Sequence, residues 1–315
     1  MFDFFSQQIQ SPNQRVNLEF LCSKNLELWI KREDQIHPEV SGNKFRKLKY
    51  NLLEAKEKGF GTLLTFGGAY SNHILATAVA GKLNGFETIG VIRGEELGEN
   101  LEKTLHGNGT LKQAYEHGMK FVFISREAYR NKTSPTLINS LKNQFGDFYL
   151  IPEGGTNELA VKGCEEILTK QDTQFDYICS CVGTGGTIAG LINSSQQHQK
   201  VLGFPALKGD FLANEIKGMV GERSNWELVS EYHFGGYSKY SDTLIEFVNE
   251  FQKKTSIPLD PIYTGKMMFG ILEMIQKKQF IEGSKILAIH TGGLQGITGF
   301  NQRLQNKGSH LRINI

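Results

Sequence analysis

Short apolar or β-branched runs alternate along the chain with glycine-containing turns and then with stretches of helical periodicity. The clearest example is a strand expected at 62–66, a turn at 67–70 and a helix from Ser71 to about Leu83. Strands in the same setting are expected at 88–92, 121–124, 148–151, 177–182 and 285–290. This order predicts a parallel α/β fold.

A second series of the same kind begins after residue 151. A turn at 152–157 leads into a helix expected to run to about Lys170, and the strand at 177–182 ends in a glycine-rich turn. There is no internal repeat and no low-complexity linker. We therefore predict two α/β halves that join near residue 150.

Four glycine-containing loops follow these strands, at 67–73, 153–157, 183–187 and 291–293. In open parallel sheets, ligands bind in the crevice outside the carboxyl ends of the strands. We therefore expect the four loops to line one cleft between the halves.

The composition is that of a globular protein: among 315 residues, 39% are hydrophobic, 22% are charged, and the formal net charge is +2. Balanced charge gives no reason to expect a nucleic-acid partner. Residues 1–6 lack the features of a signal peptide, and no apolar run reaches the length of a membrane span, so we expect no membrane partner and a cytoplasmic location. The sparse cysteines predict reduced thiols: Cys22, Cys164, Cys179 and Cys181.

Lys44 follows a Ser-Gly-Asn turn and stands at the expected first turn of a helix. The positive end of the helix dipole disfavours a further positive charge there. If Arg46, Lys47 and Lys49 are left unpaired, their charges lower the pKa of Lys44 further. A lysine with a lowered pKa is a candidate for covalent catalysis. Taken alone, the segment fits a solvated basic helix face better than a catalytic lysine.

The turn at 183–187 follows a buried strand and opens a helix. Its glycines allow several backbone N–H groups to converge on a phosphate without any lysine or arginine. A dinucleotide site and a tight turn without a ligand are the alternatives.

The helix start at Ser71, Asn72 and His73 suits a substrate carboxylate, with the Ser71 hydroxyl available for proton transfer. Simple helix capping by Ser71 or Asn72, and an ordinary core histidine, are the alternatives. Tyr237 offers a phenol in a glycine-containing turn and Tyr263 one just before an amphipathic helix, although each taken singly fits aromatic packing better.

Together these segments resemble the pyridoxal-phosphate enzymes of the tryptophan synthase β-like fold, in particular the aminocyclopropane-carboxylate deaminase and D-cysteine desulfhydrase family. The residues that carry the resemblance are Ser-Gly-Asn-Lys-x-Arg-Lys-Leu at 41–48 and the segments around Ser71, Tyr263 and Thr291, in matching order from about 28 to 300. The resemblance implies fold type II: two open, twisted, mainly parallel sheets flanked by helices. It further implies a large domain of residues 1–46 and 151–315 and a small one of 47–150, with the active site between them.

The resemblance also implies roles for individual residues. Lys44 would bind the cofactor pyridoxal 5'-phosphate covalently, Asn72 would contact the oxygen on its ring, and Thr291 would face its ring nitrogen. Ser71, Tyr237 and Tyr263 would orient the substrate and move protons. The phosphate would be held by Gly183, Thr184, Gly185, Gly186 and Thr187, and the substrate by Ser71, Asn72, His73, Tyr237 and Tyr263.

Thr264 and Thr291 stand where the ring-opening deaminases resemble one another in having glutamate and leucine. Both match the D-cysteine desulfhydrase side, which implies an enzyme that acts on a small amino acid and eliminates its β-thiol. The resemblance to the family as a whole implies a homodimer. The alternatives are deamination of 1-aminocyclopropane-1-carboxylate and, in another class, a non-catalytic protein that binds a phosphate ligand or the cofactor.

Overall fold

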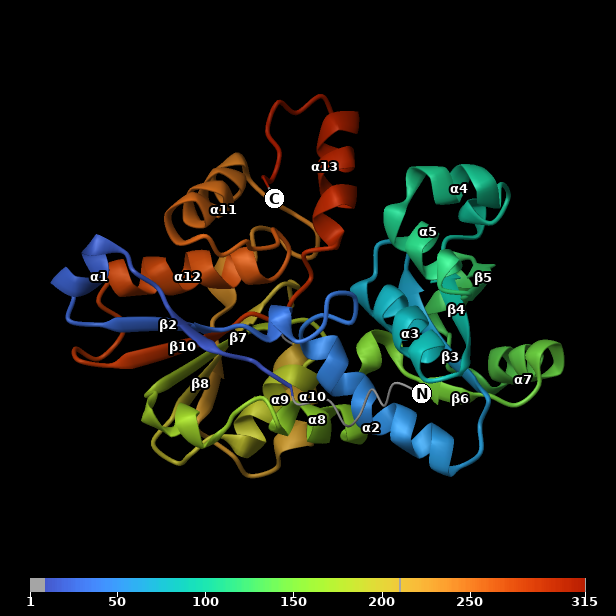
Figure 1. Ribbon diagram of the computed structural model, residues 1–315, viewed down its shortest axis with the longest axis horizontal. Coiled ribbons are helices and arrows are strands. Elements are labelled where there is room, and N and C mark those ends of the chain that lie inside the picture. Colours follow the sequence, from blue (N-terminus) through green and yellow to red (C-terminus); the bar gives the residue numbers. More distant parts are fainter. Residues whose placement is uncertain (1–8, 210, 315) are drawn as a thin grey trace.

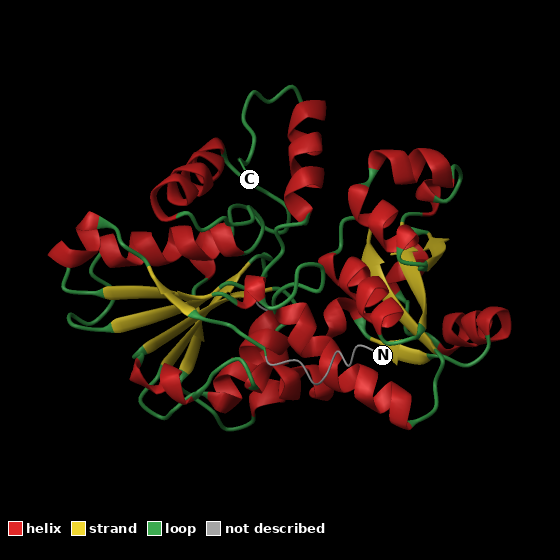
Figure 2. Ribbon diagram, in the orientation of Figure 1, coloured by secondary structure: helices red, strands yellow, loops and turns green. Residues whose placement is uncertain are grey.

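The computed structural model describes residues 9–209 and 211–314 and contains two sheets with helices around each (Figures 1 and 2). Residues 1–6, where we expect no signal peptide, lie outside the described range. Within that range, no helix is both long and apolar enough to cross a bilayer.

The larger sheet has the strand order β1-β2-β10-β7-β8-β9, and the smaller has β5-β4-β3-β6. All neighbouring strands are parallel except β1 and β2. The predicted fold, two open and mainly parallel sheets flanked by helices, is therefore confirmed. The strands are β1 (Asn13–Arg15), β2 (Glu27–Lys31), β3 (Thr62–Gly68), β4 (Glu87–Arg93), β5 (Lys120–Ile124), β6 (Tyr149–Ile151), β7 (Tyr177–Val182), β8 (Lys200–Pro205), β9 (Trp226–Leu228) and β10 (Lys285–Ile289).

Helices lie on the faces of both sheets, and α2 lies beneath the region where the two halves meet (Figure 1). On the basis of the two sheets we propose the domain division expected above, with 47–150 as the small domain. The helices are α1 (Glu19–Ser23), α2 (Asn43–Glu57), α3 (Asn72–Leu83), α4 (Leu101–Gly107), α5 (Gly109–Glu116), α6 (Arg126–Arg130), α7 (Pro135–Phe145), α8 (Glu158–Glu165), α9 (Gly186–Ser194), α10 (Phe211–Val220), α11 (Asp242–Thr255), α12 (Thr264–Gln276) and α13 (Gly296–Asn306).

The helix expected to run to about Lys170 is shorter than predicted. α8 ends at Glu165, and a separate 3₁₀ helix, η4 (Lys170–Gln174), follows. Thr169 and Asp172 form a capping box, in which each side chain bonds the backbone of the other, and this begins a new helix at Lys170.

The central strands of the larger sheet are buried on both faces. In β10, Ile286 and Ala288 pack in one apolar cluster with Met268 of α12, whereas Leu287 and Ile289 pack in another with residues of α9. This two-sided burial explains why the strand reads as a continuous apolar run. Cys179 and Cys181 of β7 are buried on the α12 side, as expected for packed strand residues.

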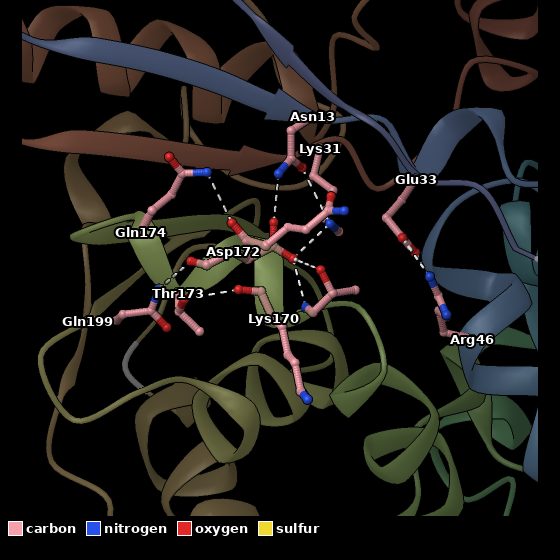
Figure 3. A network of polar contacts seen from close by, with 11 residues as sticks. Asn13, Lys31, Glu33, Arg46, Lys170, Asp172, Thr173, Gln174 and Gln199 are labelled. Carbon is pink, nitrogen blue, oxygen red and sulfur yellow. Dashed lines mark hydrogen bonds and ion pairs between the residues drawn. The ribbon is translucent and has the colours of Figure 1, made fainter.

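A buried polar network fastens β2 to η4 (Figure 3). Lys31 and Asp172 form an ion pair with 2.8 Å between Nζ and Oδ2, and the side chains are only 3% and 1% exposed. Asn13 and Thr169 donate further hydrogen bonds to the Asp172 carboxylate. Because every charge in this network is paired, it serves the fold and is not a candidate site.

Candidate active site

A cavity of about 620 Å³ lies at the carboxyl ends of the strands. It is lined by residues from all four of the loops singled out in the sequence, together with the start of α2, so the prediction of one shared cleft is confirmed. The loops reach it because strands that run in one direction place their carboxyl ends at one edge.

Lys44 lies in the first turn of α2 and lines this cavity. Its Nζ donates a hydrogen bond of 3.0 Å to the carbonyl oxygen of Gly154. Burial is the main cause that holds the pKa of Lys44 well below its ordinary value, and the charge of Lys47 acts in the same direction. The amine is therefore poised to react in its neutral form.

Of the basic residues near Lys44 in the sequence, two are paired with acids. Arg46 donates two hydrogen bonds of 2.9 Å to the Glu33 carboxylate, as Figure 3 shows, and Lys49 pairs with Glu166 at 2.7 Å. The sequence argument required these cations to be unpaired, and for Arg46 and Lys49 that condition is not met, because acids distant in sequence neutralise them. Of the three cations considered, Lys47 is the one whose charge lowers the pKa of Lys44.

Gly42 allows α2 to begin against the loop that follows β10. Its φ is +64°, and a Cβ atom there would lie 1.9 Å from the carbonyl oxygen of Thr291. The next residue, Asn43, donates its backbone N–H to that same oxygen at 3.2 Å. This close approach of two backbones brings Lys44 and Thr291 to one cavity.

Gly42→Ala is expected to lower the free energy of unfolding by about 2–6 kcal/mol, since left-handed strain and overpacking each cost about 1–3 kcal/mol. The matched control is Gly59→Ala: Gly59 also has a positive φ, +74°, but a Cβ atom there would have no neighbour within 4 Å. Chemical denaturation measures both. If both variants lose the same free energy of unfolding, the close backbone contact at Gly42 does not explain the loss.

The glycine-rich turn after β7 forms a cradle, defined as residues 183–187. Gly185 is left-handed with a φ of +83° and precedes α9, where no side chain caps the helix. The first N–H groups of α9 therefore lack intrahelical partners and stand beside the cavity. A Cβ at Gly186 would meet Thr156 at 2.9 Å and the Nζ of Lys47 at 3.3 Å.

The sequence argument expected the cradle to hold a phosphate without any lysine, yet Lys47 lies beside it. Its Nζ donates to Thr156 Oγ1 at 2.9 Å and lies 3.3 Å from the Gly154 carbonyl oxygen, yet its side chain is only 2% exposed. No carboxylate pairs with it in the described part of the chain. A buried cation without an acid, beside a helix start, suits a bound phosphate.

Ser71 precedes α3 but makes no capping hydrogen bond with its side chain, so its hydroxyl is not committed to the helix. Asn72 contributes a buried Oδ1 that has no partner among the described atoms. Buried polar atoms normally have partners, and both residues line the cavity. This helix start therefore fits a ligand that bonds Asn72.

His73 lines the cavity with Ser71 and Asn72, but its ring also takes part in the packing of the fold. Its Nε2 is 2.8 Å from Thr65 Oγ1, and the ring is buried in the small sheet's helix packing. Burial is the first cause that keeps the pKa of His73 well below its ordinary value, so the ring is neutral. The core-histidine alternative describes the ring better, which leaves the backbone N–H of His73 as the group available to a carboxylate.

Tyr263 is placed by a carboxylate at the start of α12. Asp260 accepts the backbone N–H groups of Ile262, Tyr263 and Thr264 at 2.8–2.9 Å. The Thr264 hydroxyl also donates to Asp260, at 2.7 Å, and Thr264 is fully buried. Thr264 therefore supports the turn that holds Tyr263 and does not line the cavity.

The second phenol, Tyr237, lies against Tyr263 with ring centroids 6.1 Å apart and edge-to-face geometry. Burial is the main cause that raises the pKa of each phenol. Both phenols are therefore protonated at neutral pH and are donors, in contrast to the neutral amine expected at Lys44.

Thr291 lines the cavity with its Oγ1 3.0 Å from the Sγ of Cys181. Burial raises the pKa of Cys181 to about 12, so this pair is uncharged. The sequence reasoning had not brought Cys181 to the site. A ring nitrogen at Thr291 would meet a neutral hydrogen-bonding pair.

Residues 14–292 match the family described as "Pyridoxal-phosphate dependent enzyme". The chain belongs to this family. The family's cofactor fits the groups found here: a reactive lysine at Lys44, a cradle with a buried cation for the phosphate, and an unpartnered amide oxygen at Asn72. The protein is thus a pyridoxal-phosphate-dependent enzyme, as its sequence resemblance implied.

Named relatives cover most of the chain. A mitochondrial bifunctional D-cysteine desulfhydrase/1-aminocyclopropane-1-carboxylate deaminase of Arabidopsis thaliana is 34% identical, over 92% of this chain and 77% of its own. A 1-aminocyclopropane-1-carboxylate deaminase of Bradyrhizobium diazoefficiens is 28% identical, over 90% and 91%. The crystal structure of an ACC deaminase homologue has a TM-score of 0.82 at 26% identity and covers 96% of this chain and 95% of that one.

Proposed function

We propose that the enzyme carries out α,β-elimination on D-cysteine, giving pyruvate, hydrogen sulfide and ammonia. The observation that carries this proposal is the pairing, in one cavity, of an amine of lowered pKa at Lys44 with protonated phenols at Tyr237 and Tyr263. An elimination needs a base for the α-proton and an acid for the leaving group, and this arrangement supplies both.

Pyridoxal phosphate, when bound, withdraws electrons from the substrate's α-carbon. Lys44 would hold it covalently, and the cradle, Gly183, Thr184, Gly185, Gly186 and Thr187, together with Lys47, would bind its phosphate. Asn72 would contact its ring oxygen and Thr291 its ring nitrogen. The support for these roles is the lining of the cavity and the unpartnered groups within it.

The substrate carboxylate would bind the Ser71 hydroxyl and the N–H groups at the start of α3, at Asn72 and His73. Lys44, as a neutral amine, would take the proton from the α-carbon. As the carbon–sulfur bond breaks, the sulfur would leave with its electron pair and receive a proton from Tyr263 or Tyr237, directly or through the Ser71 hydroxyl. Water would then hydrolyse the released enamine to pyruvate and ammonia.

Deamination of 1-aminocyclopropane-1-carboxylate to 2-oxobutyrate and ammonia is the second candidate, because the names of the relatives include both activities. The neutral pair of Thr291 and Cys181 favours the desulfhydrase, since it offers no charge to a ring nitrogen. Purified protein should be assayed with D-cysteine, L-cysteine, D-serine and 1-aminocyclopropane-1-carboxylate. We expect the highest kcat/KM with D-cysteine; turnover of the cyclopropane substrate alone would contradict the proposal.

The candidate from another class, a protein that binds the cofactor or a phosphate ligand without catalysis, is separated by the same panel. Binding of pyridoxal phosphate with no turnover of any of the four substrates would favour it over an enzyme.

We also propose a cytoplasmic homodimer, as the family resemblance implies. Light scattering of the purified protein is expected to give twice the mass of one chain, and a monomer at micromolar concentration would overturn that part of the proposal. The location is tested by fractionating cells that express the tagged protein. We expect it in the cytoplasmic fraction, and its recovery in another compartment would contradict this part of the proposal.

A further inference from the structure

The segment that carries Tyr237, residues 233–238, has an unusual backbone. Its φ angles are +53° at Phe234, +88° at Gly235, +112° at Gly236 and +57° at Ser238. Positive φ is uncommon outside glycine and persists only where surrounding contacts impose it. The segment must therefore be held by other parts of the molecule.

Lys266 of α12 holds the first part of this segment. Its Nζ donates to the carbonyl oxygens of His233 and Gly236, both at 2.9 Å. The side chain is only 2% exposed and has no carboxylate partner within the described residues. Burial lowers the pKa of Lys266 to about 8, against an opposing effect of Asp260.

Arg303 of α13 holds the other end. Its Nη1 donates to the carbonyl oxygen of Ser238 at 3.2 Å and also to the Ser238 hydroxyl. The guanidinium lies 6.0 Å from the centre of the Tyr240 ring, which further restrains the chain after Ser238. Tyr237 is thus bracketed by two cations from different helices.

A lysine that only stabilised the fold would be unfavourable at this buried position. A buried ammonium loses its hydration, and each of the two carbonyl groups already accepts a backbone N–H: His233 from Gly236, and Gly236 from Lys239. The hydrogen bonds from Lys266 are therefore not needed to satisfy these carbonyl groups. They restrict the conformation of the turn. We relate this to the placement of Tyr237, a residue that lines the cavity, is 45% exposed and packs edge-to-face against Tyr263.

We propose that Lys266 and Arg303 are positioning residues: they fix the 233–238 segment through its carbonyl groups and so hold the Tyr237 phenol against Tyr263 at the cavity. This inference rests on the proposed function in assigning the phenols to proton transfer. Its physical part, that the two cations order the segment, is independent of which substrate the enzyme uses.

The kinetic test is a double-mutant cycle between Lys266→Met and Tyr237→Phe. Lys266→Met is expected to lower kcat by about tenfold to a hundredfold, the scale of one misplaced proton donor, while KM changes less than about threefold. In the Tyr237→Phe background the same change should cost less than about threefold, because both act through one phenol. Lys277→Met, at an exposed lysine just after α12, is the matched control and should leave kcat unchanged.

A second readout does not depend on activity. Trypsin cleavage after Lys239, identified by mass spectrometry of the cofactor-free protein, should become about tenfold faster in Lys266→Met. It should also become faster in Arg303→Met, which tests the other end of the segment. Circular dichroism melting should show the Lys266→Met fold retained, since the variant removes a buried charge.

The inference is overturned if cleavage after Lys239 is unchanged in both variants, whatever the substrate panel shows. It is also overturned if the losses from Lys266→Met and Tyr237→Phe are fully additive in kcat. An enzyme inactive with all four substrates, in which trypsin still detects release of the segment, would instead count against the proposed function and leave the positioning contacts supported.

Discussion

Lys44→Ala is expected to lower kcat/KM for the best substrate by about 10⁴-fold, the upper range for loss of one positioned acid–base group. The reason is that Lys44 lines the cavity from the first turn of α2, and burial holds its pKa well below the ordinary value, so that its amine is reactive. The variant should still fold, because its Nζ donates only one hydrogen bond, to Gly154.

The control for this prediction is Lys58→Ala. Lys58 ends the same helix, is exposed, and pairs only with Glu54 one turn away, an interaction of small energy. Steady-state kinetics with D-cysteine and with 1-aminocyclopropane-1-carboxylate should show wild-type rates for Lys58→Ala. If Lys44→Ala retains more than about a tenth of the activity towards either substrate, Lys44 is not the covalent residue.

Lys47→Met is expected to weaken binding of pyridoxal phosphate by roughly tenfold to a hundredfold. A charge-assisted hydrogen bond contributes about 1.5–3 kcal/mol, and each 1.4 kcal/mol is a factor of ten. Lys47 has no acid to satisfy it in the described structure and lies beside Gly186 of the cradle. Equilibrium titration of cofactor-free protein measures the effect.

A ligand without the phosphate and a control variant test whether the effect is specific. Binding of pyridoxal, which lacks the phosphate, should be nearly unaffected by Lys47→Met, and Lys49→Met should leave binding of the phosphate form unchanged because Lys49 pairs with Glu166. An equal loss for pyridoxal and for its phosphate would show that Lys47 supports the fold of the cavity and does not bind the phosphate.

The same variant carries a pH prediction with a defined sign. The charge of Lys47 is one cause of the lowered pKa of Lys44, so its removal should raise that pKa towards the ordinary value of 10.5. The rate of covalent attachment, which needs the neutral amine, should then rise with pH at a higher pH than in the wild type. A profile displaced to lower pH would contradict the electrostatic account.

Much of the fold was predictable because burial leaves a direct mark on the sequence. The strand expected at 177–182 coincides with β7, since both of its faces are covered and every residue in it is buried. The end of α8 was not predictable from periodicity, because it depends on the reciprocal bonds between Thr169 and Asp172. Local capping decided that boundary.

In the site, the loops were predictable but their electrostatics were not. The pairing of Arg46 with Glu33 and of Lys49 with Glu166 depends on contacts across long stretches of chain. Lys47 had one available signal: it stands three residues after Lys44, on the same face of the helix. The sequence did not indicate that Thr264 is buried against Asp260. The choice of substrate therefore used a residue that supports the turn and does not line the cavity.

The most direct measurement of the central claim is reduction of the cofactor-loaded protein with borohydride, followed by digestion and mass spectrometry of the peptides. Reduction makes the bond between lysine and cofactor permanent, so the modified residue can be read directly. The account predicts stoichiometric modification of Lys44 and no modification in Lys44→Ala. Modification of Lys47 or Lys266 in place of Lys44, or no covalent cofactor in a loaded wild-type protein, would contradict it.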